Sequence, residues 1–283
     1  MRISVITATY NLIENNRWDT FQRAVASVRA QMHADIEHGI VDGGSTDGTV
    51  ERLREMEAGG ELVLLHSAPD TGVYQAMNRG IAAASGDYVM YLTSDDFYHR
   101  ETGLADIASV ATTQNAGFVA SAVRVAETPP REERVSPGLA RILVRIPCAH
   151  PGFAVRRDVL ERFGGFDESY RISADYDLML RMMIRGVRFG IVKQSFATFE
   201  PGGVSSDADL RLEERIRMMK AAFDPVHKVS ADDWRWSLQN ERPPAALLKR
   251  LIVSPRMSMR MRGIAAYQLF RVATRAAPPR EAS

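Results

Sequence analysis

Two adjacent carboxylates, Asp95 and Asp96, stand just beyond an apolar run from Tyr88 to Leu92. The run has the length and the β-branched and aromatic content of a strand that is buried on both faces. Neighbouring acids at the carboxyl end of such a strand repel each other and resist desolvation, and a cation relieves both costs. The pair therefore predicts a divalent-metal site at the edge of a sheet. The alternative is that the two acids cap a helix beginning near Glu101 or lie in a solvated turn.

Other polar residues lie at comparable places in the first half of the chain. Asp42 and Asp70 follow the second and third predicted strands, and Thr7 lies near the end of the first. The carboxyl ends of parallel strands meet at one edge of a sheet, which is where open α/β sheets bind ligands. We therefore expect these three side chains and Asp95 to gather along a common edge. Glycines and small hydroxyl residues in the loop 42–49 would let a ligand approach the backbone closely.

The elements that must position these residues follow from hydrophobic periodicity. Strand-like runs alternate with segments whose apolar residues recur at helical spacing, and the runs cover residues 2–8, 36–41, 61–66, 88–92 and 117–125. This alternation predicts an α/β fold with a Rossmann-like, mostly parallel sheet and helices on both faces. A charged segment with two prolines, residues 128–134, predicts a mobile loop. The glycine-rich segment 200–206 predicts either a plain turn or a loop that folds over a ligand.

A second pair of acids, Asp175 and Asp177, stands in the first turn of a helix predicted over residues 175–186. Capping alone explains one of them, because the helix dipole favours negative charge at this end. The backbone donors of a helix start also lower the pKa of a carboxylate and fix its position. Asp175 would then be ionised and oriented at neutral pH, which suits a general base.

The composition bounds the class of protein. The chain has 283 residues, 45% of them hydrophobic, and a formal net charge of +1. These values are typical of a soluble globular protein and give no reason to expect a nucleic-acid partner. Cys148 is the only cysteine, which excludes an intramolecular disulfide and suits a reducing cytoplasm. The sequence shows neither a signal-peptide pattern nor the ~20 consecutive apolar residues that span a bilayer. We therefore expect a cytoplasmic protein.

The C-terminal part differs from the rest, and we predict a catalytic domain over residues 1–206 and a helical extension over 207–283. From Pro243 to Arg275 basic residues alternate with apolar ones, and no acid lies among them. Two short basic amphipathic helices broken at Pro255 would suit an anionic membrane surface. The alternative is that they pack on the main domain with their arginines in water.

The order of five motifs resembles that of the family 2 glycosyltransferases, most closely the branch associated with bacterial exopolysaccharide, colanic-acid and O-antigen assembly. The resemblance covers roughly residues 1–206. The motifs are ISVITATYN at 3–11, VDGGSTDGT at 41–49, DTGVYQAMNRG at 70–80, GDYVMYLTSDD at 86–96 and ADYDL at 174–178.

This resemblance implies a GT-A fold and an inverting transfer of a sugar from a nucleotide-diphosphate donor, such as a UDP-sugar, to a saccharide or lipid-linked acceptor. It implies a divalent metal, Mn²⁺ or Mg²⁺, and work in the cytoplasm or on the inner face of the cell membrane. The residues expected to hold the nucleotide are Thr7, Ala8, Tyr10, Asp42, Asp70, Asn78 and Ser94. The metal is expected at Asp95 with Asp96 beside it. Asp175 matches the catalytic base, and Asp177 is expected to support it.

One residue departs from the family's pattern. Many relatives have an acid where this chain has Thr93, so the first acid of the metal motif is missing. A hydroxyl at this place implies weak metal affinity, or a metal delivered mainly by the diphosphate. His150 is a candidate contact to the diphosphate or the acceptor, and a packed structural histidine is the alternative.

Other nucleotide-binding classes lack their motifs in this chain. A dinucleotide-dependent dehydrogenase would need G-x-G-x-x-G after the first strand, and a P-loop NTPase would need G-x-x-x-x-G-K-[ST]. The glycine-rich, arginine-containing loop expected of a sugar nucleotidylyltransferase is also absent. The remaining alternative is a non-catalytic protein that binds nucleotide sugars or serves as a scaffold with the same fold, an interpretation that Thr93 encourages.

Overall fold

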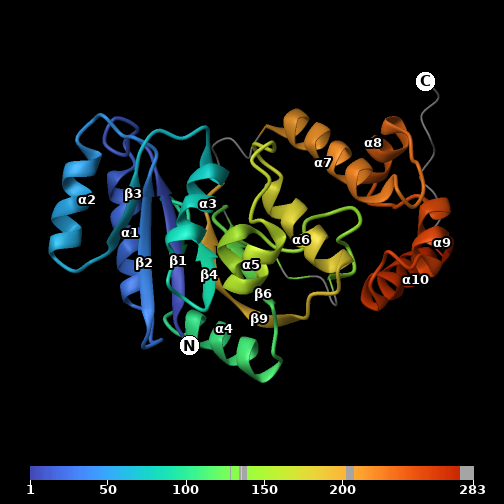
Figure 1. Ribbon diagram of the computed structural model, residues 1–283, viewed down its shortest axis with the longest axis horizontal. Helices are drawn as coiled ribbons and strands as arrows, with labels where there is room; N and C mark the ends of the chain where they lie inside the picture. Colours follow the sequence, from blue (N-terminus) through green and yellow to red (C-terminus); the bar gives the residue numbers. More distant parts are fainter. Residues whose placement is uncertain (128, 134, 136–138, 202–206, 275–283) are drawn as a thin grey trace. The chain divides into compact units, whose positions relative to one another are not determined.

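The computed structural model describes the chain except for residues 128, 134, 136–138, 202–206 and 275–283 (Figure 1). The chain divides into two compact units. The first unit comprises Met1–Val135, Cys148–Leu178 and Arg188–Ser206, and the second comprises Ser136–Pro147, Met179–Val187 and Asp207–Ser283. Two earlier segments therefore belong with the C-terminal helices, which composition alone does not indicate.

The first unit is built on one sheet, in which nine strands are found among the described residues. Their order across the sheet is β3-β2-β1-β4-β8-β6-β9-β5, and β7 pairs with β6. The strands are β1 Ile3–Thr9, β2 Ile36–Asp42, β3 Val63–Ser67, β4 Tyr88–Tyr91, β5 Phe97–Tyr98, β6 Phe118–Val125, β7 Arg131–Glu133, β8 Phe153–Arg156 and β9 Phe189–Phe199. The helices are α1 Trp18–Arg29, α2 Thr49–Ala58, α3 Val73–Ala83, α4 Gly103–Thr113, the 3-10 turn η2 His150–Gly152, α5 Arg157–Phe163 and α6 Ala174–Ile184, whose last turns belong to the second unit.

The first four strands run in parallel and end on the same edge of the sheet. β1 pairs with both β2 and β4, so that Thr9 lies opposite Asp42 and Ile6 opposite Tyr91. β2 pairs in parallel with β3. α3 packs closely on β1 because Gly80 has no side chain, and a Cβ there would lie 2.4 Å from Cγ2 of Ile6. The loops that follow these four strands are thereby brought to one edge.

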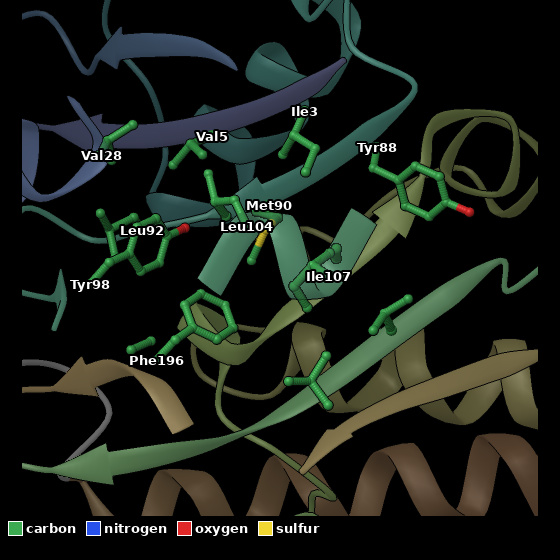
Figure 2. Close-up of a cluster of buried hydrophobic side chains, with 14 of the residues drawn as sticks. Ile3, Val5, Val28, Tyr88, Met90, Leu92, Tyr98, Leu104, Ile107 and Phe196 are labelled. Carbon is green, nitrogen blue, oxygen red and sulfur yellow. The ribbon is translucent and has the colours of Figure 1, made fainter. Parts of the chain in front are cut away.

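One part of the core lies between the sheet and helices α1 and α4. Figure 2 shows Ile3 and Val5 of β1 and Met90 of β4 in one cluster with Leu104 and Ile107 of α4. All five side chains are fully buried. Truncating a buried Met to Ala costs about 2–5 kcal/mol, so β4 is firmly anchored. The turn that follows β4 therefore starts from a rigid strand.

Predicted and observed bounds of the first four strands differ by at most two residues. The prediction of a mobile loop over residues 128–134 is wrong for its centre, because Arg131–Glu133 forms β7 and pairs antiparallel with β6. The pairing supplies partners for backbone groups, which the charge and proline content of the segment does not reveal. Part of the glycine-rich segment, residues 202–206, lies outside the described residues.

The second unit is helical in its described part and contains α7 Ala208–Phe223, α8 Ala231–Gln239, α9 Ala245–Val253 and α10 Met259–Thr274. The side chain of Asp207 caps α7 by accepting from the backbone N–H of Leu210, and Ser230 caps α8. Trp234 of α8 is fully buried and stacks on Phe223 with 6.1 Å between ring centroids. Ser258 ties the start of α10 to the end of α6, since its Oγ donates to the carbonyl of Met183 at 2.8 Å. Among the described helices, none is both long enough and apolar enough to cross a membrane.

Candidate functional site

The two neighbouring acids after β4 have different surroundings. Asp96 is fully buried, and both of its carboxylate oxygens are engaged. Its Oδ1 accepts from the backbone N–H of Glu200 at 2.9 Å, and its Oδ2 accepts from Oγ1 of Thr93 at 2.7 Å. The side chain of Asp95 is instead 27% exposed. Asp96 therefore fastens the acidic turn, residues 93–96, to the end of β9, while Asp95 keeps a carboxylate open to solvent.

Two arginines of the segment that follows β1 lie against Asp95. Nη1 of Arg17 is 3.8 Å from Oδ2 of Asp95, a loose ion pair. Nη2 of Arg23 donates to the backbone carbonyl of Asp95 at 3.0 Å and pairs with Oε1 of Glu200 at 3.0 Å. The Arg23 guanidinium also lies 4.2 Å from the ring centroid of Phe97. Arg23 thus holds the backbone of the acidic turn and also binds Glu200, the residue whose backbone N–H donates to Asp96.

His150 lies where the predicted acids converge. Its Nε2 is 3.2 Å from Oδ2 of Asp96. Burial lowers the pKa of this imidazole, but the charges of Asp96, Asp175 and Asp95 raise it, and the net pKa lies above its ordinary value. Carboxylates from two segments that are distant in sequence, the turn 93–96 and the start of α6, therefore act on one histidine.

Asp175 reaches this place from the first turn of α6. It is half-buried, and its Oδ1 accepts from the backbone N–H of Tyr176 at 2.7 Å. Asp177, in the same turn, is also half-buried. The segment before α6 is fixed to α3, because the hydroxyl of Tyr74 donates to the carbonyl of Ile172 at 2.6 Å. The carboxylate of Asp175 is thus held at a helix start, where the dipole stabilises its charge.

Asp42, at the end of β2, is bound entirely by the loop that follows it and by the ends of β1 and β3. It is fully buried. Its Oδ2 accepts from the backbone N–H groups of Gly44 at 3.0 Å and Ser45 at 2.9 Å and from Oγ of Ser67 at 3.1 Å. Its Oδ1 accepts from Oγ of Ser45 at 2.5 Å and Oγ1 of Thr9 at 3.3 Å. The carboxylate shapes the loop after β2 and offers no exposed surface to a ligand.

Beside this loop lies a small open platform, which consists of Tyr10, Gly43 and Asp70. Tyr10 is 59% exposed. A Cβ on Gly43 would lie 2.7 Å from Oδ2 of Asp70 and 3.4 Å from Cδ2 of Tyr10. Asp70 is itself held in place, since its Oδ1 accepts from the backbone N–H of Gly72 at 3.0 Å. An aromatic ring, a carboxylate and bare backbone therefore meet at the strand-end edge.

Three other predicted nucleotide residues are covered by the protein to a larger degree. Thr7 is fully buried within β1, and its Oγ1 lies 3.0 Å from Nε2 of His38. Burial lowers the pKa of His38 to about 4, so this imidazole is neutral at physiological pH. Ser94 is buried in the acidic turn, and Ala8 is half-buried. The structure does not place Thr7 on the platform, and its role at the nucleotide stays a prediction.

Asn78 is likewise occupied by protein contacts. Its side-chain N–H donates to the carbonyl of Phe166 at 2.9 Å and to Oε1 of Glu168 at 2.8 Å. Its Oδ1 accepts from the backbone N–H of Phe166 at 2.9 Å. Asn78 therefore clasps the segment between α5 and α6 to α3, and its predicted contact with the nucleotide is not visible in this geometry.

The acidic residues of the described chain do not form a closed metal cage. No group of three or more His, Cys, Asp or Glu side chains that could hold a metal ion is found among the described residues. Asp95 offers one exposed carboxylate, whereas the oxygens of Asp96 already have donors. Mg²⁺ is commonly held by one or two carboxylates together with substrate phosphates. The donor set at the acidic turn fits a divalent metal that shares its ligands with a diphosphate.

Comparison with known families decides the classification. The family model for Glycosyl transferase family 2 matches residues 4–164, more than half of the chain. This chain belongs to glycosyl transferase family 2. The matched part of the family 2 domain contains the loops that follow β1, β2, β3 and β4, whereas Asp175 and Asp177 lie beyond it.

Curated relatives are named as glycosyltransferases. A PGL/p-HBAD biosynthesis glycosyltransferase of Mycobacterium bovis is 31% identical over 157 residues, which are 55% of this chain and 61% of that protein. A glycosyltransferase of Mycobacterium tuberculosis, named as uncharacterized, is 33% identical over 192 residues, which are 63% of this chain and 68% of that protein. The chain thus spans about three fifths of the length of the first relative.

Solved structures show the same fold. S. aureus TarS 1–349 in complex with UDP-GlcNAc superposes with a TM-score of 0.67 at 16% identity, covering 96% of this chain and 89% of that fragment. The mannosyltransferase PcManGT from Pyrobaculum calidifontis, in complex with GDP-Man and Mn²⁺, gives a TM-score of 0.60 at 18% identity, covering 98% of this chain and 76% of that one. These similarities confirm the predicted GT-A, Rossmann-like α/β fold with C-terminal helices.

Sequence patterns did not single out several residues at this family 2 site. Arg17 and Arg23 hold the acidic turn of residues 93–96, and Glu200 meets it from the end of β9. Their contacts join segments that are distant in sequence, so no spacing rule indicates them. In the sequence, Gly43 is one of several glycines in the loop 42–49, and no pattern marks it as the position where an added Cβ would meet Asp70.

Proposed function

We propose that the chain is an inverting glycosyltransferase that moves a sugar from a nucleotide-diphosphate donor, such as a UDP-sugar, to a saccharide or lipid-linked acceptor in bacterial surface polysaccharide synthesis. The observation that carries the proposal is the convergence of Asp95, Asp96 and Asp175 around His150 at the strand-end edge. Structural neighbours in complex with UDP-GlcNAc and GDP-Man support the donor class, and the relative named as a PGL/p-HBAD biosynthesis glycosyltransferase supports the transfer reaction. The reaction would take place in the cytoplasm or on the inner face of the cell membrane.

The platform of Tyr10, Gly43 and Asp70 is the place proposed for the nucleoside. A base can lie flat against the exposed ring of Tyr10, because aromatic side chains stack favourably on other π-systems. Gly43 is buried and lets Asp70 and Tyr10 lie close over the loop, and the carboxylate of Asp70 can accept hydrogen bonds from ribose hydroxyls. Asp42 supports the same function indirectly by shaping the loop beneath the platform.

The diphosphate is proposed to lie at the acidic turn, with Asp95 as the protein ligand of Mn²⁺ or Mg²⁺. Such a cation, when bound, supplies Lewis-acid stabilisation of the negative charge on the departing diphosphate. Asp95 would orient that end of the donor, and its exposed carboxylate suits a shared coordination sphere. Asp96 as a second ligand stays a prediction with less support, because its oxygens already accept from Thr93 and the backbone of Glu200.

Asp175 is proposed to be the general base. An acceptor hydroxyl is too weakly acidic to ionise beforehand, so a carboxylate takes its proton as the new bond forms to the anomeric carbon. The oxygen attacks from the face opposite the diphosphate, and this single displacement inverts the configuration. Asp177 would support Asp175 from the same helical turn. His150 would lie beside both the leaving group and the base, because the charges of Asp95 and Asp175 both raise the pKa of its imidazole.

Release of nucleoside diphosphate from a panel of nucleotide sugars, with and without saccharide or lipid-linked acceptors, tests this function. We expect Asp175→Asn to lower transfer about 10²- to 10⁴-fold, the usual contribution of general-base catalysis, while donor binding in a thermal-shift assay is retained. A wild-type chain that binds a donor but neither hydrolyses nor transfers it would instead be the non-catalytic binding protein. Transfer with retention of the anomeric configuration, read by NMR, would overturn the inverting mechanism.

A further inference from the structure

An apolar stripe runs along the outward face of α10. Met259, Tyr267 and Phe270 are 79%, 51% and 67% exposed. Gly263 and Ala266, between them, are also exposed, so the stripe follows the helical repeat and contains no long polar side chain. The inner face of the same helix is closed, and it consists of the buried residues Met261, Ile264, Ala265 and Gln268. The exposure is therefore confined to one side of a well-packed helix.

The stripe is unusual within this chain. Of the nine large hydrophobic side chains that are exposed in the described residues, four belong to α9 and α10, and Val253 at 71% is the fourth. Single exposed hydrophobic residues are common on protein surfaces and need no explanation. Three on one face of a single helix, with a fourth on the neighbouring helix, indicate a surface that is covered when the protein works.

The same two helices carry a strongly uneven charge. Between Pro243 and Thr274 there is no Asp or Glu, and the basic residues are Lys249, Arg250, Arg256, Arg260, Arg262 and Arg271. Because the whole chain has a net charge of only +1, the remainder of the chain is net negative. Lys249 and Arg250 are exposed on α9, and the guanidinium of Arg271 lies 5.8 Å from the ring centroid of Tyr267. Positive charge thus borders the apolar stripe.

We propose that the outward face of α10, together with the basic residues of α9, docks on the anionic leaflet of a lipid bilayer. Basic side chains attract anionic headgroups, while Phe270, Tyr267 and Met259 can enter the boundary between headgroups and acyl chains. A symmetric dimer through this face is disfavoured, because an isologous interface would bring the basic residues of two copies together, with Arg271 beside the stripe on both. An acidic protein partner would satisfy the charge but would gain less from the apolar stripe.

This docking deepens the proposed function, on which one part of it rests: the acceptor would be lipid-linked and would be reached from the membrane surface. The docking itself does not depend on catalysis. Vesicle binding and sugar transfer are therefore separate properties, and each can be measured without the other.

The test is co-sedimentation of the full chain with vesicles of phosphatidylcholine alone and of phosphatidylcholine mixed with phosphatidylglycerol. We expect binding to the mixed vesicles only, weakened by added salt because the headgroup attraction is screened. The double variant Tyr267→Ser, Phe270→Ser should lose most of this binding. Met32→Ser is the matched control, because Met32 is 69% exposed in the first unit and should have no effect on binding.

A charge variant sharpens the result. Lys249→Gln with Arg250→Gln should weaken binding to the mixed vesicles about 25-fold, since each basic residue near an anionic surface contributes about fivefold. Arg54→Gln with Lys193→Gln makes the same change in net charge at exposed positions of the first unit and should change binding little. Equal effects of the two pairs would show a non-specific charge response and overturn the proposal.

Two further outcomes would also overturn it. One is wild-type protein that stays in the supernatant with mixed vesicles. The other is a concentration-dependent dimer, seen by sedimentation velocity, that Tyr267→Ser with Phe270→Ser abolishes, because this would make the stripe a contact between copies. Transfer to a water-soluble saccharide acceptor should be equal in wild type and all these variants. If vesicle binding is present but no donor is turned over, the proposed function fails and the docking surface stands.

Discussion

β2 ends in one acid, Asp42, and the turn after β4 ends in two, Asp95 and Asp96, yet the two regions use their carboxylates differently. In the loop, Asp42 is buried and takes five hydrogen bonds from its own surroundings. In the turn, Asp96 is buried in the same manner, and its neighbour Asp95 remains open. A lone acid at this position holds a loop together, whereas a pair can divide the work, with one carboxylate fixing the backbone that presents the other.

The largest effect should come from the loop. We expect Asp42→Asn to lower the free energy of unfolding by about 4 kcal/mol, because an amide cannot accept from all five donors and buried donors left without partners cost about 1–3 kcal/mol each. Urea denaturation with an unchanged m-value would measure this loss. Asp35→Asn is the control, since Asp35 is 58% exposed and only 3.6 Å from Arg2 in a surface pair. A midpoint as high as that of the control would contradict the structural role of Asp42.

The strand that carries Asp42 should also give the protein a pH dependence. His38 has a folded pKa of about 4, below the ordinary value of 6.5, so the unfolded chain binds its proton more readily. Stability should therefore be complete above pH 6.5 and fall by about 3 kcal/mol as the pH drops from about 6.5 to about 4. We expect His38→Gln to flatten this part of the stability curve measured by urea denaturation. His33→Gln, which removes a histidine near the surface, should leave the curve as it is.

The turn should respond in activity rather than in stability. We expect Asp95→Asn to lower turnover about 100-fold, which is about 2.7 kcal/mol of barrier, because the proposed ligand of the diphosphate-bound cation loses its charge. The urea midpoint should stay close to wild type, since the pair with Arg17 is loose and partly exposed. Asp96→Asn, by contrast, should lower both. Full activity of the Asp95 variant would remove this carboxylate from the proposed mechanism.

The smallest effect is expected for Arg23, whose guanidinium binds the backbone carbonyl of Asp95 in the acidic turn. We expect Arg23→Gln to lower turnover about tenfold and to raise the metal concentration needed for half-maximal activity, because the Asp95 carbonyl and Glu200 lose their shared donor. Arg29→Gln is a control on the same helix, where Arg29 pairs with Glu61 at 2.8 Å. Restoration of the metal response by Arg23→Lys would show that charge, rather than the planar guanidinium, is what the turn requires.

Much of this arrangement could be predicted from the sequence, because β1 to β4 have the regular alternation of a parallel sheet and each is followed by a polar loop. β8 escaped prediction because its four residues, Phe153–Arg156, are too few to show a period. The difference between Asp42 and Asp95 could not be predicted either. Both are acids at strand ends, and their exposure is decided by donors from distant segments, such as Ser67 for the one, and by contacts such as Arg17 for the other.

Gly43 matters because Asp70 and Tyr10 already fill the space where a side chain would begin. The first carbon of any side chain there would come within 2.7 Å of Oδ2 of Asp70, so that alanine already meets the obstacle that larger residues meet. We therefore expect the loss of function to occur in one step, when glycine is replaced by alanine. Larger, polar or charged residues at this position should add little to that loss. Donor binding measured across a saturation library at position 43 would show that step directly. It would separate the effect of side-chain size on the platform from the effect of side-chain polarity.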